Sequence, residues 1–195
     1  MTRPLARRLA RRIAALTTAA LVLTAPPAVA ARTAHHDARG DVLRLNASVT
    51  PQPRWKPGDI TQIRVAHRVH RVKVRIDFRD VSRGTSNFYA FKVHTPNGRF
   101  DIYGSTSPDQ PQGQWQLVTR SGTVPCPRLR HRVHYIKERV KVSAPRRCII
   151  RPARIRVGAT ASTRMSGPKE KPRFDDAYSS GQIQRSKLGP WLRRG

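Results

Sequence analysis

The sequence predicts an all-β protein, an antiparallel β-sandwich of about eight short strands, with an open β-barrel as the alternative. The first observation is the stretch HRVKVRIDFRDV at residues 70–81. Its apolar and polar side chains alternate, so a pleated strand would have one dry and one wet face. The second is a series of further short apolar stretches, separated by clusters of Gly, Pro, Asn and Ser. Most of them have a single apolar face and none has a convincing helical period, which favours the sandwich.

The first thirty residues have the composition of a secretory signal peptide. Five arginines between Arg3 and Arg12 precede an apolar run at 13–24, and Ala28-Val29-Ala30 supplies the small residues that signal peptidase requires. The apolar run is short for a membrane span, and no second long apolar run follows. We therefore predict cleavage after Ala30 and a monomeric protein that is secreted, either extracellular or associated with the cell wall. Residues 31–40 are small and polar and are predicted to form a flexible N-terminal arm.

The predicted sandwich domain covers residues 41–160. Pro96-Asn97-Gly98 is the strongest turn signal and indicates a hairpin between two of its strands. In chain order, the predicted strands are 41–49, 60–67, 70–81, 88–95, 99–105 and 114–120, then the two arms of a hairpin within 126–148, and 151–160. Residues 161–195 are rich in Gly, Ser, Pro and charge, so we predict a mostly disordered C-terminal tail.

Two cysteines, Cys126 and Cys148, lie near the ends of the last predicted hairpin. An even number of cysteines in an exported protein indicates a disulfide rather than free thiols. The bond would close a loop of about twenty residues and stabilise the fold by roughly 3 kcal/mol. Two cysteines alone are too few for a four-ligand zinc site.

The formal net charge is +28, which favours polyanionic partners. The wet face of the 70–81 strand carries Arg71, Lys73, Arg75 and Arg79, and Arg64 and Arg68 precede it on the neighbouring strand and turn. We therefore expect an Arg-rich sheet face that binds an anionic polymer of the cell envelope, teichoic acid or acidic polysaccharide. Nucleic acid is the less favoured polyanion because the protein is exported. The cations are also spread along the chain, so the alternative is that the charge serves only solubility.

Two other functions remain open. A neutral carbohydrate-binding module would use the rings of Trp55 and Tyr103 as stacking platforms, although the favoured role of Trp55 is a lid over the end of the core. Trp115 is less suited, since its register places it in the core. An extracellular polymer-acting hydrolase is the second alternative. The sequence has no G-x-S-x-G elbow, no H-E-x-x-H and few acids, so we predict no enzyme, no catalytic residue and no cofactor.

Metal-ligand spacing is weak in this sequence. His67 and His70 are three residues apart and would lie on opposite faces of a strand, which argues against a metal pair. Asp175-Asp176 is the only acidic doublet, and it could bind a metal together with Asp37 or Asp41. We favour a salt bridge from this doublet to a nearby arginine, because arginine is abundant, and predict no metal site.

A resemblance to a group of bacterial proteins rests on three features. These are the export signal, the Arg-rich alternating strands in GDITQIRVAHRVHRVKVRIDFRDV at 58–81, and Pro-Arg-Arg-Cys at 145–148. They look like those of small exported proteins of actinobacteria, and the similarity covers most of residues 41–160. The resemblance implies a source and an exported location, and it implies no activity, ligand or functional residue. The central strands also resemble those of sugar-binding sandwich modules, which is a likeness of fold alone.

Overall fold

A computed structural model describes the chain at residues 31–44, 50–165, 171–179 and 186–195. These parts are folded mainly into β-strands, with one short 3₁₀ turn, η1 (Arg146–Ile149). The predicted signal peptide, residues 1–30, lies outside the described residues. Within the described ranges, no helix is long and apolar enough to cross a membrane.

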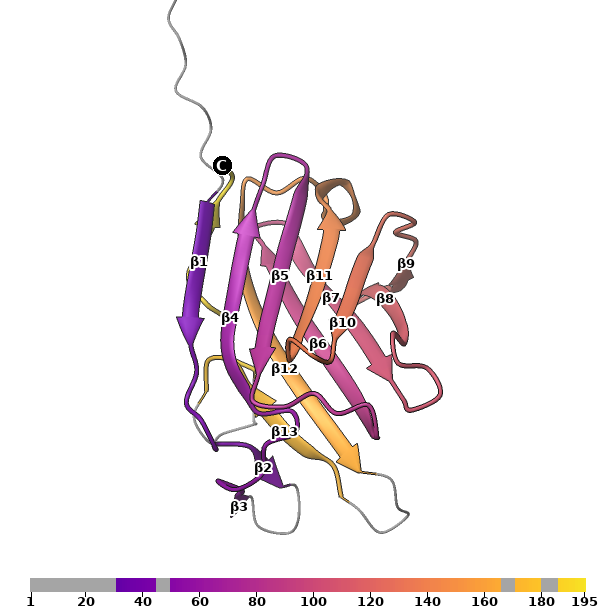
Figure 1. Ribbon diagram of the computed structural model, residues 1–195. Coiled ribbons are helices and arrows are strands. Elements are labelled where there is room, and N and C mark those ends of the chain that lie inside the picture. Colours follow the sequence, from indigo (N-terminus) through magenta and orange to yellow (C-terminus); the bar gives the residue numbers. More distant parts are fainter. Residues whose placement is uncertain (1–30, 45–49, 166–170, 180–185) are drawn as a thin grey trace, which may run out of the picture.

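The first layer of the fold is a five-stranded antiparallel sheet, which we call sheet A (Figure 1). The central strand predicted from the sequence is its middle strand, β5 (Arg71–Phe78), and its neighbours β4 (Ile60–His67) and β11 (Arg139–Pro145) both run antiparallel to it. Across the sheet, the order is β1 (Ala31–His36), β4 (Ile60–His67), β5 (Arg71–Phe78), β11 (Arg139–Pro145) and β10 (Arg130–His134).

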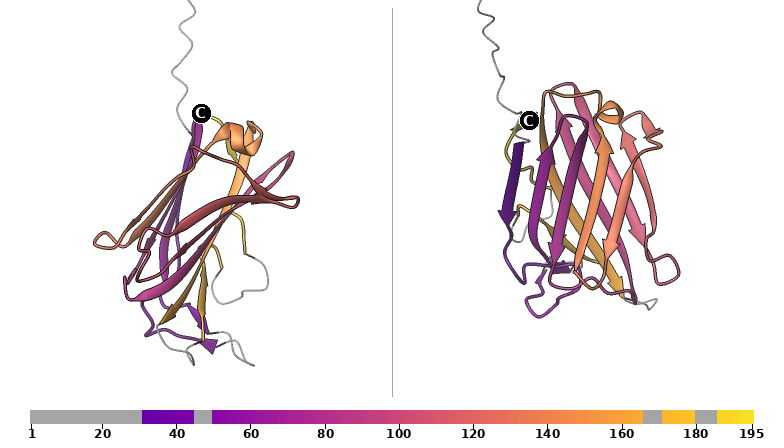
Figure 2. Two further views of the ribbon diagram at one scale, coloured as in Figure 1. Left: turned by 90° about the vertical axis from the view of Figure 1, so that its right-hand side faces the viewer. Right: turned by 45° about the horizontal axis from the view of Figure 1, so that its top comes forward.

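The second layer, sheet B, has nine strands, and its long strands β6 (Thr85–Thr95), β7 (Gly98–Thr106) and β12 (Arg154–Met165) run diagonally behind those of sheet A in Figure 1. Figure 2 shows the same layering from a second direction, in its right-hand view. The two antiparallel sheets are not closed into a barrel, so the predicted sandwich is confirmed. Across sheet B, the order is β3 (Thr50–Pro51), β2 (Leu43–Arg44), β13 (Arg173–Asp176), β12 (Arg154–Met165), β6 (Thr85–Thr95), β7 (Gly98–Thr106), β8 (Gln114–Thr119) and β9 (Gly122–Val124), and β14 (Leu192–Arg193) pairs with β12.

The core lies between the two sheets, where their apolar faces meet. The alternation in β5 has the predicted consequence, because Val72, Val74, Ile76 and Phe78 are all buried. From sheet B, residues such as Phe91 are buried against them. Each such side chain contributes roughly 1.5–3 kcal/mol when it is fully buried. Sheet A therefore keeps one face dry and leaves the polar half of its alternating residues on its outer face.

The N-terminal arm differs from the prediction. Residues 31–36 form β1 and pair with β4 along their whole length, from Ala31 opposite His67 to His36 opposite Gln62. Most of these side chains are exposed, so the segment lacks the apolar alternation by which a strand is recognised. Its backbone hydrogen bonds to β4 hold it in place instead. β2 lies within the strand predicted at 41–49, of which residues 45–49 lie outside the described residues. β3 and β9 were not predicted, because two or three residues are too few to show an alternating pattern.

The C-terminal region also differs from the prediction of a mostly disordered tail. Its described parts cover the edge of β12 that does not pair with β6. β13 pairs with residues 160–163, the amides of Ala177 and Gly189 donate to Ala159 and Val157, and β14 pairs with Arg154 and Ile155. Leu192 is buried in the core. This region has few apolar residues, and its position is set by backbone hydrogen bonds to β12 rather than by an apolar pattern. Residues 166–170 and 180–185 lie outside the described residues.

Gly158 in β12 allows the C-terminal chain to approach this closely. A Cβ at this position would overlap the carbonyl oxygen of Lys187 and press on Leu188. We expect Gly158→Ala to lower the free energy of unfolding by about 1–3 kcal/mol, because the chain must move away from β12. Urea denaturation measures this loss. Gly84→Ala is the matched control, since a Cβ there meets Ser82 Oγ at an ordinary 3.7 Å. Equal stability of the two variants would contradict the expected role of Gly158.

Candidate anion-binding surface

The outer face of sheet A carries cations in register across neighbouring strands. Arg64 of β4 lies opposite Arg75 of β5, which lies opposite Lys141 of β11, which lies opposite Arg132 of β10. Side chains directly opposite each other in an antiparallel sheet are about 5 Å apart at Cβ. A second line contains Arg32, Lys73 and Arg130, separated by Ala66 and Ser143. We call these residues the cationic face: Arg32, Arg64, Lys73, Arg75, Arg130, Arg132 and Lys141.

Positive charges this close to one another repel. Desolvation lowers the pKa of the Lys73 amine, and Arg68, Arg71, Arg130 and Arg32 lower it further. At the outward positions of the sheet A strands, Asp77 is the one carboxylate, and it lies at one end of the cationic face. It forms ion pairs with Arg75 on its own strand (2.8 Å) and with Arg139 on the neighbouring strand (3.1 Å). Most of the face thus has no carboxylate to neutralise it.

A groove of about 560 Å³ runs over the cationic face. Its charged lining residues come from four strands and from the turn between β4 and β5. They are Arg32, Arg64, Arg68, Lys73, Arg75 and Lys141. No carboxylate lines this groove among the described residues.

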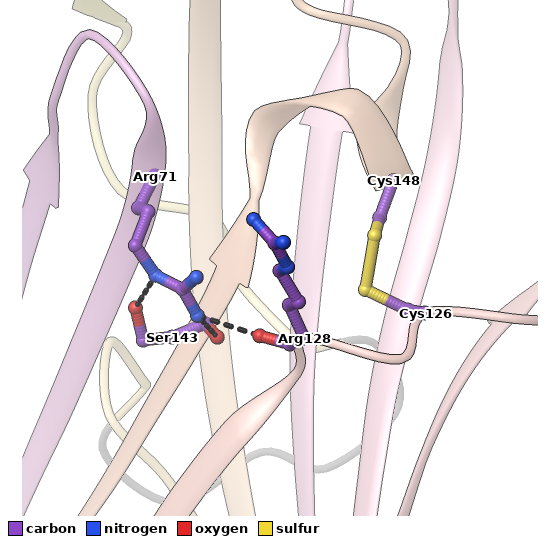
Figure 3. The surroundings of a disulfide bond; sticks show 5 residues. All are labelled: Arg71, Cys126, Arg128, Ser143 and Cys148. Carbon is purple, nitrogen blue, oxygen red and sulfur yellow. Dashed lines mark hydrogen bonds between the residues drawn. A yellow bond between two sulfur atoms is a disulfide. The ribbon is translucent and has the colours of Figure 1, made fainter.

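A second cavity, of about 470 Å³, lies beside the disulfide at one end of sheet A. Figure 3 shows the Arg128 side chain between Arg71 and the disulfide. The Arg71 guanidinium donates to Ser143 Oγ (2.7 Å) and to the carbonyl oxygen of Arg128 (2.8 Å), so it ties that loop to the sheet. We call this cavity the arginine pocket, after the arginines that line it: Arg71, Arg128, Arg146, Arg147 and Arg151.

Disulfide geometry and one buried arginine fix the walls of the arginine pocket. The predicted bond joins Cys126 to Cys148, with a Cα–Cα distance of 5.8 Å. Arg128 and Arg147 lie within two residues of this bond in the sequence. Arg146 is buried, and its guanidinium donates to the carbonyl oxygens of Val69 (2.8 Å) and Pro152 (2.6 Å). The bond and this arginine therefore hold the loops that carry the exposed arginines.

The structure brings together most of the cations that the sequence analysis selected. Arg64, Arg71, Lys73 and Arg75 project from the outer face of sheet A, and Arg68 lines the groove. Arg79 does not continue this row, because β5 ends at Phe78. It forms an ion pair with the buried carboxylate of Asp59 at 2.8 Å.

Sequence reasoning missed the other half of the surface. Arg32 was assigned to a flexible arm, whereas Arg130, Arg132 and Lys141 lie in the cysteine hairpin. In the sequence of the hairpin, these cations alternate with apolar residues or histidine, so their outward direction could have been predicted. The pairing of β11 with β5, which brings them beside Lys73 and Arg75, has no local signal in the sequence.

The two aromatic residues selected for sugar stacking differ in their surroundings. Trp55 is half-buried, its indole N–H donates to Pro57 O (2.7 Å), and the Arg173 guanidinium lies 3.5 Å from its ring centre. Tyr103 lies on the outer face of sheet B and stacks on Phe88 at 5.5 Å, and Phe88 is 44% exposed. A cavity of about 200 Å³ beside this pair is also lined by Gln114 and Gln116. The exposed aromatic platform is thus Tyr103 with Phe88.

Carboxylates from two distant parts of the sequence come together where they could hold a metal ion. Oxygens of Asp37, Asp41 and Asp175 all lie within 4.8 Å of one another. Burial, followed by the charge of Asp41, raises the pKa of Asp37 to about 8, and burial raises that of Asp175 to about 9. None of the salt bridges among the described residues involves Asp175 or Asp176, so the arginine partner that we favoured for them is not found there.

Fold and surface together describe a disulfide-bonded β-sandwich with cations aligned across the outer face of sheet A. No protein-family model matches the chain, and neither a curated protein nor a solved structure is significantly similar to it. The function is therefore inferred from the chemistry of the surface.

Proposed function

We propose that this is an exported, non-catalytic protein that binds an anionic polymer of the cell envelope, teichoic acid or acidic polysaccharide, through the cationic face. The observation that carries the proposal is the alignment of cations across the outer face of sheet A. Four cations lie directly opposite one another on four strands: Arg64, Arg75, Lys141 and Arg132. On sheet B, by contrast, Lys92 lies opposite Asp101 and Arg99 lies opposite His94. A charge that served only solubility would need no such alignment.

A linear polymer suits the shape of this surface. Cations repeat about every 5 Å across the strands and about every 7 Å along each strand, so a chain with regularly spaced anions can meet several of them at once. Arg71 belongs to β5 and also lines the arginine pocket, so the positive surface continues from the sheet to that cavity. Multivalent attachment of this kind is tight at low salt and weakens steeply as salt rises.

Two features support the exported location. The N-terminal sequence has the three regions of a signal peptide, and the fold includes a disulfide, which persists in oxidising compartments.

Cosedimentation of the oxidised protein with cell-wall sacculi tests the proposal. We expect the protein to pellet with intact walls at low salt, to be released along a salt series, and to stay in solution with walls stripped of teichoic acid and acidic polysaccharide. Equal pelleting with intact and stripped walls at all salt concentrations would contradict the proposal. Soluble teichoic acid added to intact walls should compete the protein off, which checks that the anionic polymer itself is bound.

Phe88 and Tyr103 favour a second candidate, a neutral carbohydrate ligand on sheet B. Two stacked rings beside two amide side chains provide both an apolar platform and hydrogen-bond partners for sugar hydroxyls. Binding of this kind would survive high salt and would be lost in Tyr103→Ala. Wall binding that is insensitive to salt, and that disappears in this variant, would replace the cationic face by the aromatic platform as the binding surface.

A further inference from the structure

Aspartates from three separate segments meet at one end of the sandwich. Asp37 and Asp41 lie in the loop between β1 and β2, Asp59 immediately precedes β4, and Asp175 and Asp176 belong to β13. The amide of Ile60 donates to Asp175 Oδ2 (2.5 Å), and the amide of Gly40 donates to Asp59 Oδ2 (2.9 Å). These two bonds hold the loop, the start of β4 and β13 against one another.

Several of these carboxylates lack the partners that buried charges require. Both oxygens of Asp41 and Oδ2 of Asp37 are each shielded from solvent to below 1 Å² and accept no hydrogen bond. Independently of them, the side chain of Asp59 is 0% exposed. Its Oδ2 meets Arg79 and the amide of Gly40, within the 37–41 loop, and its Oδ1 has no partner. Unpaired buried carboxylate oxygens cost free energy, so their accumulation at one place indicates a missing positive charge.

Arginine does not supply that charge. The chain has 39 Lys and Arg against 11 Asp and Glu, so cations for simple ion pairs are plentiful. Arg79 forms an ion pair with Asp59. The charge of Arg39 acts to lower the pKa of Asp59, and the charge of Lys92 acts to lower the pKa of Asp176. Nevertheless, no ion pair within the described part of the chain involves Asp37, Asp41 or Asp175, and their oxygens face one another instead. An arrangement that excludes abundant arginine from three close carboxylates suits a small, compact cation.

We propose that Asp37, Asp41 and Asp175 bind one Ca²⁺ ion. The ligand atoms are all oxygens, which selects hard cations over zinc or copper. Their mutual separations are all within 4.8 Å. These separations suit Ca²⁺, because two ligands that are each about 2.3–2.6 Å from one ion lie at most about 4.6–5.2 Å apart. Mg²⁺ is less suited, because it demands a near-ideal octahedron and gives up its waters reluctantly. The ion would connect the β1–β2 loop to β13, so it would strengthen this end of the sandwich.

Thermal unfolding in CaCl₂ and in the chelator EGTA tests this site. At saturating Ca²⁺ we expect the unfolding midpoint of the purified, oxidised protein to rise by about 5 °C or more, because the ion binds the folded state alone. Isothermal titration with CaCl₂ should give binding with a stoichiometry near one. MgCl₂ should raise the midpoint less than CaCl₂. The same midpoint in CaCl₂ and EGTA without a heat of binding would overturn the proposal, and a larger rise with MgCl₂ would overturn the choice of ion.

Asp41→Asn separates ion binding from a merely structural role of the cluster. Removing one negative charge relieves repulsion among the carboxylates, so we expect the variant in EGTA to be at least as stable as the original protein. The rise with CaCl₂ should be lost. Asp109→Asn changes an exposed carboxylate in the β7–β8 loop and should keep the full rise. A full rise retained by Asp41→Asn would overturn the assignment of the ligands, and destabilisation of this variant in EGTA without a Ca²⁺ effect in the original protein would leave a purely structural cluster.

Discussion

Replacing Lys73, Arg132 and Lys141 by glutamate is expected to weaken binding of teichoic acid by about 100-fold at low salt. The three side chains are exposed and come from β5, β10 and β11, so the change reverses charge across the cationic face without touching the core. Each lost contact also removes released counterions, so the dependence of affinity on salt should become shallower. Fluorescence polarisation with labelled teichoic acid along a salt series measures both quantities.

A matched triple variant separates the cationic face from net charge. Arg99, Arg120 and Arg164 are exposed, lie on sheet B or in its β8–β9 turn, and give the same change in net charge when replaced by glutamate. We expect this control to lose far less affinity, because its cations are not aligned beside one another. If the two triple variants lost affinity equally, the polymer would be responding to overall charge, and the cationic face would have no special role.

Changing Cys126 and Cys148 together to serine is expected to lower the free energy of unfolding by about 3 kcal/mol. The bond closes a loop with a sequence separation of 22 residues, and the open chain gains the conformational freedom that this closure removes. Urea denaturation of the double variant, compared with the oxidised and the reduced original protein, measures the loss. The reduced protein should match the variant.

Loss of the disulfide should also increase the local flexibility of the chain beside it. Arg128 and Arg147 flank the bond, so its loss should loosen the arginine pocket more than the middle of the cationic face. Protease cleavage between residues 125 and 151 should therefore become faster under native conditions. A stability change well below about 1 kcal/mol would show that β10 and β11 hold this hairpin in place without the bond.

The sequence predicts those elements that have a local cause. Alternation identifies β5, and Pro96-Asn97-Gly98 marks the turn between β6 and β7. The cysteine pair identifies the β10–β11 hairpin. In each case neighbouring residues decide the structure, through a side-chain period, a turn conformation or a bond across a short loop.

The remaining elements depend on partners that are distant in the sequence. β1 and β13 have few apolar residues to reveal them, and they are strands because β4 and β12 offer open edges. The contact between Ile60 and Asp175 joins residues 115 positions apart, so the acidic cluster cannot be read from spacing. Arg79 departs from the predicted row of cations for a related reason: the period of two continues past Phe78 in sequence, but the strand ends there and the side chain turns to Asp59.

β12 pairs on one side with β6 and on the other with segments that all follow residue 172. Until those segments have been synthesised, a long strand of sheet B has one row of unpaired backbone groups. Such an edge is a template for pairing with another chain. Chains cut short before β13 are therefore expected to associate with one another rather than remain as single folded molecules. By pairing with the open edge of β12, the described C-terminal segments would therefore prevent that edge from pairing with another chain.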